Sequence, residues 1–125
     1  MNGARRFLLP ALMAFEAATL VLMSSLHLAG ILDDGSQPFD RVHAGIAEAI
    51  IALVLVGGAA AALRAKRVLA AASVAFALVG FGIGLSFTIR GGAAASAAYH
   101  VTVLPLLVGT LVPLVRISYR RSRTR

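Results

Sequence analysis

Long apolar runs separated by short polar segments set the pattern of this chain. Four runs reach the roughly 20 apolar residues that a helix needs to cross the hydrocarbon core of a bilayer, and they cover residues 7–32, 44–63, 68–89 and 97–115. Short connections place sequential helices side by side in antiparallel order. The pattern therefore predicts an all-α fold: one transmembrane domain, 1–125, built as an up-down-up-down four-helix bundle with short loops.

The three connections carry residues that must stay out of lipid. The first, 33–40, combines three aspartates with glycine and proline, and the second, 64–67, holds three basic residues. The third begins with Arg90 and two glycines. Irregular backbone exposed to lipid has unsatisfied polar groups, so these segments are expected to lie in water at the two membrane surfaces.

The basic residues are distributed unevenly between the two predicted sides. Arg41 and Arg90 lie on one side, and the ten others lie on the opposite side, in the N-terminal segment, the second connection and a basic tail, 116–125. Positive charge is retained in the cytoplasm. We therefore expect a cell (inner) membrane protein with cytoplasmic N and C termini and with the first and third connections outside.

Composition narrows the class of protein. The chain is 59% hydrophobic and only 14% charged, which is untypical of a soluble domain of 125 residues. Its net charge of +7 lies at helix ends, so the lipid bilayer, and not a nucleic acid, is the expected partner. The content of alanine, glycine and arginine is typical of a GC-rich bacterial genome. The absence of cysteine excludes disulfides and thiolate metal sites.

A cleaved signal peptide is the alternative interpretation of the first run. The arginine pair Arg5 and Arg6 precedes it, and it ends near the small residues Ala29 and Gly30. The run is longer than a typical signal core and contains Glu16, which favours a retained span.

Small residues are concentrated on the second and third runs. Residues 57–62 are all glycine or alanine, and Gly80 and Gly84 have the four-residue spacing of a close helix crossing. The pattern predicts tight packing inside the bundle, with a homo-oligomer or a larger membrane complex as the alternative use of these faces.

Polar side chains within the spans are the candidates for function, because such groups are costly in lipid. The candidate ligand-binding residues are His27, Glu48, Arg90, Tyr99, His100 and Glu16. All but Glu16 lie near the predicted outer surface, and at about 1.5 Å per residue His27 and Glu48 lie roughly 6 to 8 Å below it. We expect one polar pocket open to the extracytoplasmic side, with Arg90 as the nearest counter-charge of Glu48.

Several kinds of chemistry fit these residues. The first is a ligand or cofactor of haem or quinone type, with His27 and His100 as axial ligands if the cofactor is haem b. The second is a small proton-coupled carrier that uses Glu16 and Glu48, and the third is an accessory or assembly protein without catalytic chemistry. A zinc or copper site would need His43 as well and has no supporting spacing. Without a nucleophile elbow or an HExxH motif, an enzyme is not favoured.

Overall fold

The structure is a computed structural model that describes residues 3–32, 40–91 and 94–122. These residues form helices joined by turns, and no strand occurs within the described ranges. The helices are α1 (Gly3–Leu28), α2 (Arg41–Leu63), α3 (Arg67–Thr88) and α4 (Ala94–Ser122). The predicted all-α fold of four long apolar helices is confirmed.

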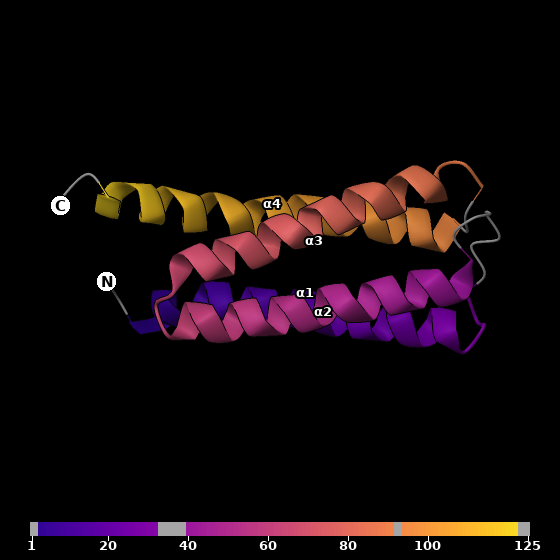
Figure 1. Cartoon of the computed structure of the whole chain (residues 1–125), viewed down its shortest axis with the longest axis horizontal. Coiled ribbons are helices and arrows are strands. Elements are labelled where there is room, and N and C mark those ends of the chain that lie inside the picture. Colours follow the sequence, from indigo (N-terminus) through magenta and orange to yellow (C-terminus); the bar gives the residue numbers. More distant parts are fainter. Residues whose placement is uncertain (1–2, 33–39, 92–93, 123–125) are drawn as a thin grey trace.

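The four helices run alternately up and down the long axis of the molecule (Figure 1). Both ends of the chain and the turn between α2 and α3 lie at one end of the bundle, while the C-terminal ends of α1 and α3 lie at the other. Each helix packs along its sequence neighbour, and α1 and α4 meet over a shorter stretch. The result is a bundle whose helices pack in sequence order.

The end of α1 differs from the predicted run. The helix stops at Leu28 and Gly30 follows with a φ of 73°, a left-handed conformation that glycine adopts without strain. The Ile31 amide then donates to the carbonyl of Leu26 at 3.0 Å, which closes the last turn. Ile31 and Leu32 are therefore apolar residues outside the helix, although hydropathy extends the run to residue 32.

The start of α2 is fixed by Asp40. Its Oδ1 accepts hydrogen bonds of 3.0 Å from the backbone amides of Val42 and His43, as expected of an N-cap, and lies 2.8 Å from His43 Nδ1. These bonds, above all the one from the His43 amide, lower the pKa of Asp40. The helix consequently begins at Arg41, three residues before the predicted span.

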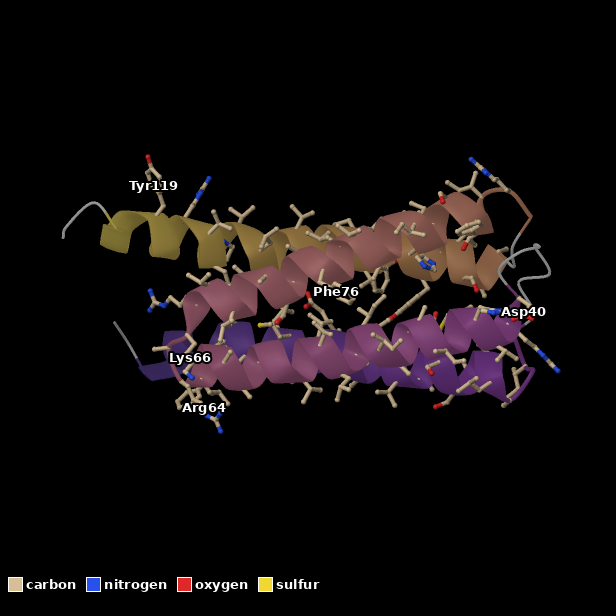
Figure 2. All side chains as sticks on the ribbon, viewed as in Figure 1. Asp40, Arg64, Lys66, Phe76 and Tyr119 are labelled. Carbon is tan, nitrogen blue, oxygen red and sulfur yellow. The ribbon has the colours of Figure 1, made fainter. Side chains whose placement is uncertain are left out.

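The turn between α2 and α3 is short. Ala65 adopts a positive φ of 58°, and the Lys66 amide donates to the carbonyl of Ala61 at 2.8 Å. Figure 2 shows Arg64 and Lys66 at this end of the bundle and Asp40 at the opposite end. The turn agrees with the predicted basic connection at 64–67.

The outer surface of the bundle is largely apolar, and its interior combines a hydrophobic core with buried polar residues. Large apolar side chains such as Leu53, Val68 and Ile89 are more than two-thirds exposed, while eight polar residues of the described part of the chain are buried. The buried polar residues are Glu16, Ser24, His27, Glu48, Thr88, Ser96, His100 and Thr110. All four helices are long and apolar enough to cross a membrane. An apolar exterior around a partly polar interior is compatible with a transmembrane helical bundle.

Candidate functional site: buried polar residues beside a lateral cavity

The centre of the candidate site is a bond between α1 and α2. His27 Nδ1 lies 2.8 Å from Glu48 Oε2, and the two side chains are 0% and 9% exposed. A buried carboxylate without a partner would cost several kcal/mol. The imidazole supplies that partner, so the structure brings together two residues that the sequence placed at one depth.

Gly45 allows α1 and α2 to approach closely at this level. A Cβ at this position would lie 2.7 Å from Leu28 Cγ and 3.2 Å from the Ser24 carbonyl oxygen. In the space that glycine leaves, the Ser24 hydroxyl donates to the Gly45 carbonyl at 2.7 Å. The backbone contact one turn before Glu48 thus holds the carboxylate opposite His27.

Ser96 connects this pair to α4. Its hydroxyl lies 3.5 Å from His27 Nε2, a long contact, and its carbonyl accepts a hydrogen bond of 2.7 Å from His100 Nδ1. The order Glu48, His27, Ser96 is that of a carboxylate, a base and a hydroxyl nucleophile. Ser96 is fully buried and is not among the residues that line the cavity described below.

His100 is held between aromatic rings and a glycine. Its ring centroid lies 5.2 Å from that of Phe81 and 5.9 Å from that of Tyr99. A Cβ on Gly84 would lie 2.5 Å from His100 Nε2, so the missing side chain provides the space in which the imidazole sits. Nε2 is therefore directed at α3, where Gly84 lines a cavity.

That cavity lies mainly between α2 and α3 and has a volume of about 390 Å³. Its polar lining consists of Glu48, Thr88 and His100, and the remaining lining residues are apolar: Leu20, Ala44, Ala47, Ile50, Ile51, Phe76, Val79, Gly80, Phe81, Ile83 and Gly84. Ile50, Phe76, Val79 and Ile83 are about half exposed or more, so the cavity opens at the side of the bundle. Figure 2 marks Phe76 near the middle of the molecule, where α3 faces α2.

Thr19 connects Tyr99 to the backbone of Glu16. The Thr19 hydroxyl donates to the Glu16 carbonyl at 2.8 Å and lies 3.1 Å from the Tyr99 hydroxyl, which can therefore donate to it. Glu16 Oε1 is 2.8 Å from the Thr110 hydroxyl, while Oε2 is buried and has no hydrogen-bond partner in the described part of the chain. Neither Glu16 nor Tyr99 hydrogen-bonds with Glu48 within the described ranges.

Arg90 does not join the site as expected. It follows the end of α3, its side chain is exposed, and no ion pair links it to Glu48 in the part of the chain that the structure describes. The basic group that reaches Glu48 is His27. The reason is position, because Arg90 lies beyond the last turn of α3 and its long side chain can stay in water.

Ser96, Thr110 and the glycines 45 and 84 are site residues that sequence reasoning did not select. Ser96 precedes His100 by four residues, which places the two on one helix face and could have indicated their bond. Thr110 carries no such local signal, since its partner Glu16 lies on another helix. The glycines matter through the neighbours that they admit, which only the packed structure reveals.

The ring nitrogens of the two candidate haem ligands have different surroundings. Two histidines that ligate one haem iron must face it from opposite sides, whereas His27 contacts Glu48 and Ser96 through its two nitrogens and only His100 lines the cavity. Haem ligation stays a prediction. Among residues 3–32, 40–91 and 94–122, no three His, Cys, Asp or Glu side chains are placed to hold a metal ion.

Comparison of the chain with protein-family models, curated proteins and solved structures finds no match.

Proposed function

We propose that this protein binds a lipophilic ring compound of the quinone type in the cavity between α2 and α3. The supporting observation is the distribution of polar groups around a cavity of about 390 Å³, whose polar side chains are confined to Glu48, Thr88 and His100. Small-molecule sites typically measure about 300 to 1,000 Å³ and combine an apolar lining with a few polar groups that orient the ligand. The polar ring of such a ligand would lie against His100, and its apolar tail would lie along the apolar lining residues of the cavity.

The lateral opening supports a ligand that arrives from lipid. The residues at the border of the cavity, including Ile50, Val79 and Ile83, are both apolar and exposed. A water-soluble ligand would have to cross this apolar border, whereas a lipid-soluble one meets no polar barrier. Ligand exchange through the gap between α2 and α3 is therefore part of the proposal.

We infer further that the bundle spans the cell membrane four times with both termini in the cytoplasm. The helices have the necessary length and apolar surface. Arg64 and Lys66 lie at the end of the bundle that holds the termini, and Asp40 lies at the other end (Figure 2). This separation of charge agrees with the retention of basic residues in the cytoplasm. The ligand site would then lie nearer the outer surface.

A small proton-coupled carrier is the second candidate. It is favoured by Glu16, which is 1% exposed and whose Oε2 has no hydrogen-bond partner among the described residues. Buried acidic side chains in transmembrane helices mark ion pathways and proton relays. A carrier would move protons across liposome membranes when its cargo is supplied, whereas a binding protein would not.

A matched pair of substitutions tests the proposed binding site. Ala47 lines the cavity, and Ala49, two residues further along α2, is exposed and does not line it. Ala47→Phe should fill the cavity and weaken binding at least tenfold, while Ala49→Phe should leave the affinity unchanged. Binding of decyl-ubiquinone and of its reduced form is measured by equilibrium dialysis with protein in lipid nanodiscs. Equal affinities of the two variants, or no binding of either form to the unmodified protein, would refute the proposal.

A further inference from the structure

At the polar end of the cavity, the side chains differ in how many hydrogen-bond donors and how many acceptors they leave for a ligand. Three side chains form this end: Glu48, Thr88 and His100. For each of them, the inventory of donors and acceptors can be compared with the bonds that it already makes inside the protein. What is left over determines which head group a bound molecule must have.

His100 offers an acceptor to the cavity. Its Nδ1 lies 2.7 Å from the carbonyl oxygen of Ser96, which can only accept, so Nδ1 carries a hydrogen. His100 has no carboxylate partner among the described residues, and its ring lies against those of Phe81 and Tyr99. The other nitrogen of a neutral imidazole is an acceptor. That nitrogen, Nε2, faces Gly84 on the cavity wall.

Thr88 and Glu48 also have no donor to spare. The single hydroxyl hydrogen of Thr88 is directed to the carbonyl of Gly84 at 2.8 Å, which leaves the oxygen lone pairs. Glu48 Oε2 lies 2.8 Å from His27 Nδ1, and when the imidazole donates in this contact the carboxylate has acceptors only. The polar end of the cavity therefore consists of acceptors.

We propose that the cavity selects a head group that donates a hydrogen bond, namely a neutral hydroxyl such as that of a quinol or an alkylphenol. This inference rests on the proposed function. The carbonyl oxygen of an oxidised quinone would face only acceptors, so the hydrogen bonds that it receives from water would not be replaced. A hydroxyl would instead donate a hydrogen bond to His100 Nε2. A hydroxyl is favoured over an ammonium group because Glu48 already has His27 as its partner.

Two ligand pairs test this selectivity on the full chain in lipid nanodiscs. Decyl-ubiquinol and decyl-ubiquinone share one carbon skeleton, and 4-heptylphenol and 4-heptylanisole differ in whether the oxygen carries a hydrogen. Sites built to bond a hydroxyl reject analogues that lack it by large factors. We expect each donor to bind at least tenfold more tightly than its partner, with dissociation constants from equilibrium dialysis corrected for partitioning into empty nanodiscs.

The outcomes separate the two proposals. Equal affinity within both pairs overturns the donor selectivity and leaves the binding cavity standing, whereas no binding of any of the four compounds refutes the proposed function itself. Tighter binding of 4-heptylbenzylamine than of 4-heptylphenol overturns the choice of a neutral hydroxyl.

Replacing the proposed acceptor residues tests whether they cause the selectivity for a hydroxyl. His100→Phe keeps an aromatic ring but removes Nε2, so the ratio of phenol to anisole affinity should fall towards one while anisole still binds. His43→Phe, at an exposed position outside the cavity, should keep the ratio of the unmodified protein. If His100→Phe does not fold, Thr88→Val removes a second acceptor and should lower the ratio by a smaller factor. A ratio unchanged in a folded His100→Phe or Thr88→Val protein contradicts the assignment of that acceptor.

Discussion

Two adjacent glycines on α2 offer a direct test of how tightly this bundle is packed. Gly58 is buried, and a Cβ there would lie 2.6 Å from both Met13 Cε and Ser73 Cβ. Gly57 is exposed, and a Cβ there would meet nothing within 4 Å. The same substitution to alanine therefore has opposite consequences at neighbouring positions.

The expected magnitudes follow from two opposing effects. Replacing glycine by alanine inside a helix favours folding by about 1 kcal/mol through backbone entropy, and this is the whole effect expected for Gly57→Ala. Overpacking a close contact costs about 1 to 3 kcal/mol. The Met13 tip can move, but Ser73 Cβ is fixed by the backbone of α3, so the clash at Gly58 cannot be relieved by side-chain rotation alone. Gly58→Ala should be less stable than Gly57→Ala by about 1 to 3 kcal/mol.

The comparison is made by reversible unfolding in mixed micelles, with helical circular dichroism as the signal. The two variants have the same amino-acid composition, so an effect of composition on detergent binding is the same in both. A Gly58→Ala protein as stable as Gly57→Ala would show that α2 and α3 do not approach as closely as the structure has them, and it would remove the basis for helix packing through small residues.

Three further predictions concern topology, the buried carboxyl and the helix cap. Reporter fusions after Arg67 should read cytoplasmic and fusions at Gly92 extracytoplasmic; the reverse result would refute the orientation. Glu16→Gln should keep the bond to Thr110 and the stability within about 1 kcal/mol, whereas Thr110→Val, which leaves a second Glu16 oxygen unpaired, should cost about 1 to 3 kcal/mol in the same unfolding assay. Because the folded pKa of Asp40 is below its ordinary value, its stabilisation is present at neutral pH and is lost as the pH falls below about 4. Asp40→Asn should lack this acid-dependent loss, and an identical pH profile of unfolding would contradict it.

The helices could be predicted from the sequence because span length and loop polarity are local properties. Their ends were less predictable. Hydropathy counts Ile31 as part of the first run, but the left-handed Gly30 has already ended α1, and at α2 the Asp40 cap starts the helix before the apolar run begins. Caps and positive-φ residues act through a few local hydrogen bonds, which an average over a window does not register.

The sequence grouped the candidate residues but did not predict their pairing. Counting residues placed His27, Glu48 and His100 at one level, and in the structure His27 contacts Glu48 while Glu48 and His100 line one cavity. The choice of His27 over Arg90 as the partner of Glu48 depends on the close approach of α1 and α2 at Gly45, which is a property of two packed helices. The cavity likewise lies mainly between α2 and α3 and depends on how the two helices pack, and no periodicity in one helix encodes it.

The lateral opening of the cavity has a consequence for how occupancy is controlled. In the proposed membrane setting, a compound enters between α2 and α3 from the surrounding hydrocarbon, past Ile50 and Val79. The relevant concentration is then moles of compound per mole of lipid, and the volume of the aqueous phase matters little. Empty vesicles added to a saturated sample would lower the fraction of protein with bound compound, although the total amount of the compound stays constant. A cell that expanded its membrane without making more of the compound would lower this fraction in the same way.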